Sequence, residues 1–188
     1  MDSFTYLTVP ISIVLGLAIM ELLLRVARLI QCRARVRLYW LPLIWTGTLL
    51  LTAIQSWWAL FGLKDYDGWN FVSFLIVLLH PLAFFVAASL VLPDREEFSH
   101  GEVDLKQHYY GNFRWFFAAL LLTITASLLR PLVLYGHFDL DLDSAIQGFL
   151  FILATIAMWV PWQAYHRLVA IITPLTIVGY IALLFMRL

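Results

Sequence analysis

Six long apolar runs occupy most of the 188 residues of this chain, and they restrict its fold more than any other feature. A helix needs about 20 mostly apolar residues to cross the hydrocarbon core of a bilayer. Hydrophobic residues make up 63% of the chain, whereas only about half of a soluble domain is apolar. The sequence therefore predicts an all-α, polytopic integral membrane protein. The predicted spans are 7–30, 38–63, 70–92, 114–135, 145–162 and 168–186.

Helices are the expected elements because a backbone surrounded by lipid must satisfy its own hydrogen-bonding groups. A closed β-barrel is the other solution, but these runs lack the alternating pattern of about ten residues that barrel strands show. We therefore expect a bundle of six transmembrane helices in a single domain, 1–188. The largest segment between spans is 93–113, and its second half is expected to form a helix that runs into the fourth span.

The basic residues predict the orientation of the bundle. Nine of the basic residues fall on one side of the predicted bundle, whereas only Lys64 and Arg187 fall on the other. Arg130 falls inside a span. Lysine and arginine favour cytoplasmic loops, so both termini are expected to be extracytoplasmic and 93–113 to be a cytoplasmic loop. We expect a multi-pass protein of a bacterial cytoplasmic membrane. The nine cytoplasmic basic residues are Arg25, Arg28, Arg33, Arg35, Arg37, Arg95, Lys106, Arg114 and Arg167.

The charge and cysteine content restrict the partners. The arginines of the segment 25–37 are expected to meet anionic lipid headgroups. The formal net charge is zero, which gives no indication of a nucleic-acid partner. Assembly as a homo-oligomer or within a larger membrane complex stays open. Cys32 is the only cysteine, so an intramolecular disulfide and dithiol redox chemistry are both excluded.

Polar residues form stripes on two of the predicted helices. Residues at i, i+4 and i+7 share one face of a helix, and such a face should point toward protein rather than lipid. Two alternatives stay open, since the hydroxyls can bond carbonyls of their own helix and the arginine can reach toward headgroups. The stripes are Thr48, Thr52 and Gln55 in the second span and Thr123, Ser127 and Arg130 in the fourth.

Ionisable residues inside the spans are the strongest functional signal. A charge at the centre of a bilayer costs roughly 2.5 to 3.5 kcal/mol on insertion scales, so it needs a partner or a use. For Glu21 the alternative is an ion pair with Arg25 four residues later, and for His80 it is a hydrogen bond to a neighbouring helix. The predicted pathway or ligand-binding residues are Glu21, Thr52, Gln55, His80, Ser127 and Arg130.

The dipeptide His80–Pro81 lies near the middle of the third span. Proline has no N–H to donate, so it frees the carbonyl of Val77 beside a side chain whose unperturbed pKa is about 6.5. If protons or ions cross the bundle, we expect them to cross the midplane at this position.

A metal site is a weaker prediction. His100, Asp104 and His108 are spaced at i, i+4 and i+8, so on a continuous helix they would share one face with ligand types suited to zinc. Gly101 weakens a helix there, and the segment reads equally as a solvated approach to the fourth span. The identity of any cofactor stays open. We find no HExxH helix, GxSxG elbow or phosphate-binding glycine loop, so catalysis is unsupported and no catalytic residue is assigned.

These observations favour a membrane transport or channel protein for an ion or small solute, with proton coupling as an option through His80. Two other classes fit the same pattern. One is a non-catalytic structural subunit of a larger membrane complex, and the other is an electron-transfer protein that binds a cofactor or quinone.

Overall fold

The computed structural model describes residues 3–99, 101–138 and 140–184, and nearly all of this part of the chain is helical. Six of the helices are long and apolar enough to cross a membrane, which confirms the all-α, six-helix prediction. The long helices are α1 (Ser3–Gln31), α2 (Trp40–Ala59), α3 (Phe71–Leu90), α5 (Leu105–Tyr135), α6 (Leu142–Trp159) and α7 (Gln163–Leu184).

Short elements connect the long helices. They are η1 (Arg33–Arg35) and β1 (Val36–Arg37) before α2, η2 (Leu60–Leu63) after α2, and α4 (Arg95–Ser99) and β2 (Val103–Asp104) before α5. The two strands pair in parallel and tie the α1–α2 connection to the start of α5. The sequence does not predict this ladder, because each strand is two residues long and depends on a partner far along the chain.

Helix ends differ from the predicted boundaries where local signals override hydropathy. α5 begins at Leu105, which confirms the expected helix in the second half of 93–113 that runs into the fourth span, and its start is capped by the Asp104 carboxylate, which accepts hydrogen bonds from the backbone N–H groups of Lys106 and Gln107. α6 ends at Trp159 rather than 162, since Val160 precedes Pro161 and takes an extended conformation. α7 therefore begins at Gln163 rather than at 168.

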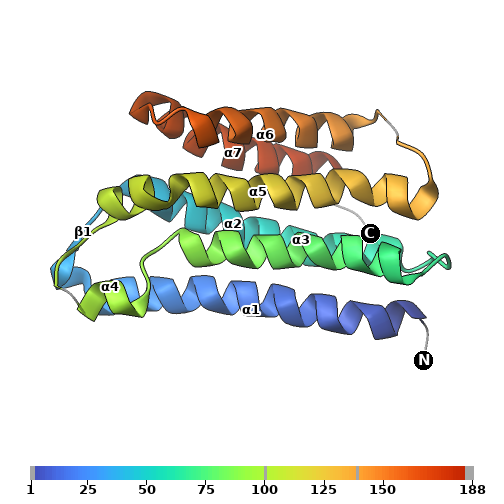
Figure 1. The fold of residues 1–188 in the computed structure, drawn as a ribbon, viewed down its shortest axis with the longest axis horizontal. Helices are drawn as coiled ribbons and strands as arrows, with labels where there is room; N and C mark the ends of the chain where they lie inside the picture. Colours follow the sequence, from blue (N-terminus) through green and yellow to red (C-terminus); the bar gives the residue numbers. More distant parts are fainter. Residues whose placement is uncertain (1–2, 100, 139, 185–188) are drawn as a thin grey trace.

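The six long helices enclose a common interior. Figure 1 shows α1, α3, α5 and α6 side by side in one layer, with α2 and α7 behind them. Helix contacts run from α1 to α3, then to α5, α6, α7 and α2, and from α2 back to α1. The layers thus close into a ring in which every long helix has an inward face.

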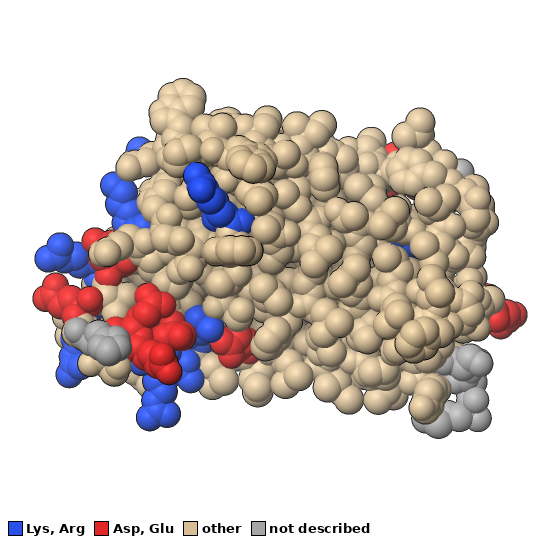
Figure 2. Space-filling view, viewed as in Figure 1, with Lys and Arg blue, Asp and Glu red and all other residues tan. Residues whose placement is uncertain are grey.

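The two ends of the bundle differ in charge. One end, called the basic end here, holds the α1–α2, α3–α5 and α6–α7 connections, and Figure 2 shows most of the visible lysine and arginine atoms there. The other, the acidic end, holds the α2–α3 and α5–α6 connections, where Asp65, Asp67 and Asp141 lie exposed. Between the ends, Figure 2 shows a broad band almost without charge. Exposed apolar side chains within the long helices include Ile54, Leu75, Leu122, Ile152 and Leu175, as expected of a lipid-facing surface.

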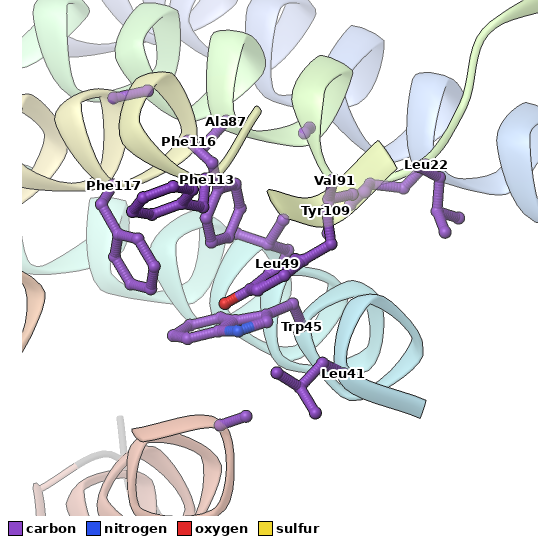
Figure 3. Close-up of a cluster of buried hydrophobic side chains, with 14 of the residues drawn as sticks. Leu22, Leu41, Trp45, Leu49, Ala87, Val91, Tyr109, Phe113, Phe116 and Phe117 are labelled. Carbon is purple, nitrogen blue, oxygen red and sulfur yellow. The ribbon is translucent and has the colours of Figure 1, made fainter. Parts of the chain in front are cut away.

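Buried side chains form two separate clusters. The larger lies in the half toward the basic end, where Trp45 of α2 packs edge-on against Phe116 and Phe117 of α5, with Tyr109 beside them (Figure 3). The smaller lies toward the acidic end and includes Ile11 of α1 and Leu60 of η2. The interior between the two clusters is the region where polar side chains point inward.

Candidate functional site

A central cavity of about 140 Å³ lies inside the ring, and residues of all six long helices line it. It occupies the half of the bundle toward the acidic end, since its lining includes Ala59 at the end of α2 and Gln147 in the second turn of α6. The polar side chains of the lining are Thr52, Gln55, Ser56, His80, Thr123, Ser127, Arg130, Gln147 and Tyr180.

The structure brings five of the six predicted pathway residues together at this cavity. α2 supplies Thr52 and Gln55, α3 supplies His80, and α5 supplies Ser127 and Arg130. Each pair from one helix is three residues apart and therefore lies on the same helical face. Residues distant in sequence meet here because the ring places α2, α3 and α5 around one space.

Four of these side chains have no hydrogen-bond partner within the described part of the chain, namely Gln55, His80, Ser127 and Arg130. Their polar atoms are not sealed off, so they stay free to bind water or a solute in the cavity. Thr52 behaves differently, because its hydroxyl donates to the carbonyl of Thr48 at 2.9 Å, as the structural interpretation of the stripe expected.

Arg130 is the only lysine or arginine among the described residues that line the cavity. Its neighbours do not neutralise it with an ion pair in the described chain. The nearby carboxylate of Asp143 accepts hydrogen bonds from the Tyr180 hydroxyl at 2.6 Å and from the Gln147 amide at 2.8 Å. The described lining of the cavity therefore holds one guanidinium and no carboxylate.

The direction of α5 explains why Arg130 lines the cavity and does not reach outward. α5 runs from the basic end toward the acidic end, and helical side chains lean toward the N-terminus of their own helix. The arginine side chain therefore leans toward the middle of the bundle, in the direction of Ser127. Its partial burial is consistent with this inward direction.

Two prolines add backbone acceptors to the lining. α3 stays helical through Pro81, and α5 through Pro131. Because proline lacks an N–H, the carbonyls four residues earlier, at Val77 and Ser127, lose their usual helical donors. Both residues line the cavity, so its wall offers acceptors as well as donors.

A second space, the apolar chamber, continues the interior toward the basic end. It measures about 100 Å³ and is lined by aromatic and aliphatic side chains, including Trp45, Phe84 and Phe117. Five residues line both spaces, so the chamber adjoins the central cavity. The shared residues are Thr52, Thr123, Ile124, Leu150 and Ile177.

An aromatic cluster around His166 closes the interior at the basic end. The imidazole is fully buried, its Nε2 lies 2.9 Å from the Val160 carbonyl, and its Nδ1 lies 2.9 Å from the Tyr109 hydroxyl. A carbonyl only accepts, so Nε2 carries the proton and Nδ1 accepts from Tyr109. The rings of Tyr110, Phe113 and Phe117 pack around it.

The predicted spans 145–162 and 168–186 leave His166 between them and do not indicate its burial. The available signal was the aromatic stripe at Tyr109, Phe113 and Phe116 on α5, which shares one helical face and marks a buried contact. The contact itself depends on α7 beginning five residues before the predicted 168.

Glu21 lies apart from the central cavity. Its carboxylate accepts from Nε of Arg25 at 2.6 Å, and Arg25 also donates to the carbonyl of Leu92 beyond the end of α3. The structure therefore shows the ion pair that was the alternative interpretation of Glu21. Arg25 is buried, so of the predicted lipid-binding arginines Arg33, Arg35 and Arg37 are the exposed ones.

The predicted metal ligands do not share a helix. His100 lies outside the described residues, Gly101 has a positive φ of 123°, and Asp104 caps α5 instead of lying within it. His108 is engaged by Glu97 at 2.9 Å and by the Leu90 carbonyl at 3.2 Å. Within the described chain no three His, Cys, Asp or Glu side chains are grouped to hold a metal ion.

No protein-family model, curated protein or solved structure matches this chain.

Proposed function

We propose that this chain is an integral membrane transport protein, and that its solute is a small anion bound in the central cavity. One observation supports the proposal most directly. Arg130 faces a cavity bounded by all six long helices, and no described carboxylate forms an ion pair with it. An arginine stays charged at any physiological pH, so a cavity with one unpaired guanidinium attracts an anion.

The other lining groups suit the same ligand. Gln55 and Ser127 carry donors that the described protein does not use; Gln55 lies on α2, which contacts α5, and Ser127 lies three residues before Arg130 on α5 itself. Charge-assisted hydrogen bonds from such donors to an anion are stronger than bonds between neutral groups. An anion held by Arg130, Gln55 and Ser127 would replace part of its hydration shell with protein donors.

His80 supports a link between solute and proton. Its imidazole lines the same cavity as Arg130, beside Pro81. An imidazole can take up a proton, and an anion bound beside it would favour the protonated form, so His80 offers a proton-binding group next to the anion. We propose that a proton accompanies the solute through this residue.

For the orientation in the membrane, we propose that the basic end is cytoplasmic and both termini are extracytoplasmic, in a bacterial cytoplasmic membrane. Nine of the basic residues support this, because they lie at or near the basic end while Lys64 lies at the acidic end. Cysteines introduced one at a time at the exposed positions Asp67 and Ser99, in a Cys32→Ser background, test it. An impermeant maleimide added outside should label position 67 and leave 99 unmodified, and the reverse result would invert the bundle.

The transport proposal is tested in proteoliposomes loaded with chloride or methanesulfonate, both of which stay ionised and cross a pure bilayer slowly. Dissipation of an imposed anion gradient should require the protein. Arg130→Gln should slow it about tenfold to a hundredfold, as expected when a hydrogen bond to a charged group is lost. The matched control is Arg114→Gln, an exposed arginine on the same helix that does not line the cavity.

Two outcomes would contradict the proposal. Equal flux in the Arg130→Gln and unmodified proteins would remove the guanidinium from the pathway. Absence of anion flux under any gradient, with the protein correctly folded, would favour a structural subunit. A coloured or redox-active molecule that copurifies in stoichiometric amount would instead favour the electron-transfer class.

A further inference from the structure

We infer that the anion is amphipathic, an organic monoanion whose short apolar tail occupies the apolar chamber. This inference rests on the proposed anion site and names the class of solute it takes. The observation behind it is that two unlike spaces adjoin. One is a polar cavity with a single guanidinium, the other is a chamber lined by Trp45, Phe84 and Phe117, and five residues line both.

The distance between the two spaces fits a short organic chain. Arg130 and Thr123 lie seven residues apart on α5, about 10 Å along the helix axis. The arginine side chain leans back toward Thr123, which shortens the gap between guanidinium and chamber. An anion bound at Arg130 therefore places the next few atoms of its carbon skeleton at the mouth of the apolar chamber.

The chamber suits an apolar tail better than water. Three of the four threonines in its wall, Thr48, Thr52 and Thr123, each donate to a carbonyl of their own helix, at 2.8 to 2.9 Å, and the fourth is Thr173. Their donors are therefore already used, and the remaining wall is mainly hydrocarbon and aromatic. Small apolar cavities in proteins stay dry and take up apolar guests of matching size.

An inorganic anion would use only half of this interior. Chloride at Arg130 would leave the chamber without any role in binding. A compact dianion would find only one permanently charged cation, because Arg130 is the only lysine or arginine in the described lining and His80 is a cation only while it carries a proton. A single charged head with a hydrocarbon tail uses both spaces and needs only one cation.

The test is a series of straight-chain alkanesulfonates, from methanesulfonate to octanesulfonate, titrated onto the full chain in lipid nanodiscs. Sulfonates stay ionised, so uptake of a neutral acid into lipid does not interfere. We expect affinity to rise up to about fourfold for each methylene that enters the chamber and then to level off when the chamber is filled. Empty nanodiscs correct for partition into lipid.

Two variants test the binding of the apolar tail and of the charged head separately. Ala154, 5% exposed, lines the chamber, so Ala154→Leu should flatten the chain-length series and leave methanesulfonate affinity unchanged. The matched control Ala145→Leu adds the same atoms at an exposed position of α6 and should leave the series intact. Arg130→Gln should weaken every sulfonate by a similar factor. Thermal unfolding of each variant reports whether it is folded.

The outcomes distinguish this inference from the proposed function. If methanesulfonate binds through Arg130 but the series is flat in the unmodified protein, the amphipathic solute is wrong and the anion site stands. If no sulfonate binds and no anion crosses proteoliposomes, both fail. If the series rises equally in the Ala154→Leu protein, the tail lies outside the chamber and the inference is overturned.

Discussion

Arg25 and Arg130 are both arginines within long apolar helices, one in each half of the bundle, and their surroundings differ. Arg25 is buried, pairs with Glu21 on its own helix and donates to the carbonyl of Leu92. Arg130 faces the central cavity and, within the described chain, forms neither an ion pair nor a hydrogen bond to a backbone carbonyl. The first arginine ties α1 to the end of α3, whereas the second is available to a solute.

The histidines repeat this contrast. His166, in the half toward the basic end, is fully buried, and both its ring nitrogens are hydrogen-bonded. His80, near the middle of the bundle, lines the cavity without a hydrogen bond to a described residue. An unused polar group inside an apolar bundle costs free energy, so the groups at the cavity mark where function is expected.

The largest effect should come from replacing the two histidines. His166→Ala removes a packed ring and leaves the Tyr109 hydroxyl and the Val160 carbonyl without their partner, which should cost about 3 kcal/mol or more. His80→Ala should change stability by less than about 1 kcal/mol and slow proton-coupled flux in proteoliposomes at least tenfold. Unfolding in mixed micelles, followed by tryptophan fluorescence, measures the loss of stability in each variant.

Two results for the His80→Ala protein would contradict these expectations. If the His80→Ala protein folds and transports at the normal rate, His80 does not carry the proton. If it loses as much stability as His166→Ala, His80 is a packed core residue and the contrast between the two histidines fails.

The next effect concerns the two arginines. Arg25→Gln should lower the free energy of unfolding by about 2 to 3 kcal/mol, since Glu21 and the Leu92 carbonyl lose a charged donor. Arg130→Gln should cost less than about 1 kcal/mol, because no described group depends on it. Chemical unfolding of both variants under identical conditions gives the comparison.

A double variant sharpens the assignment of Arg25. If the ion pair is what Arg25→Gln disrupts, then adding Glu21→Gln should recover part of the loss, because it removes the unpaired carboxylate. A loss that is the same with and without Glu21→Gln would assign the stability to the bond with Leu92 alone. Equal losses of unfolding free energy for Arg25→Gln and Arg130→Gln would contradict the expected difference between the two arginines.

Much of the fold follows from the sequence because the bilayer requirement acts on each helix separately. A run of apolar residues long enough to span predicts a helix without knowledge of its neighbours. The helix that leads into the fourth span was expected and begins at Leu105, whereas the end of α6 at Trp159 shifted because it depends on Pro161, a local signal that hydropathy does not weigh. The two-residue ladder depends on a distant partner and was not predictable.

For the candidate site, the stripes on α2 and α5 follow from helical spacing, but their meeting does not. The ring order of the helices decides that Gln55, His80 and Arg130 share a cavity, and nothing in the sequence gives this order. Glu21 lies outside the cavity because α1 lines it with Ile11 and Leu15, which lie nearer the acidic end than Glu21. The burial of His166 and the hydrogen bond from Tyr180 to Asp143 also depend on contacts between helices.

The smallest effect should come from Asp141, an exposed residue at the acidic end. Its carboxylate accepts a 2.9 Å hydrogen bond from the backbone N–H of Ser144 at the start of α6, and this bond lowers the pKa of Asp141 below its usual value of 3.8. A carboxyl with a depressed folded-state pKa stabilises the fold at pH values above its unfolded pKa. The contribution shrinks as the pH falls below 3.8 and is lost once the pH passes the folded-state pKa.

Asp141→Asn tests this contribution, because the amide oxygen can still accept from Ser144 but carries no charge to titrate. The range from about pH 5 to about pH 3 brackets the usual pKa of 3.8 for an aspartate. Over this range the melting temperature of the unmodified protein should fall slightly more steeply than that of Asp141→Asn. Anion binding should be unchanged in both, since Asp141 does not line the central cavity. A loss of sulfonate affinity in Asp141→Asn would extend the site to the acidic end and weaken the assignment of Arg130 as the group that holds the charge.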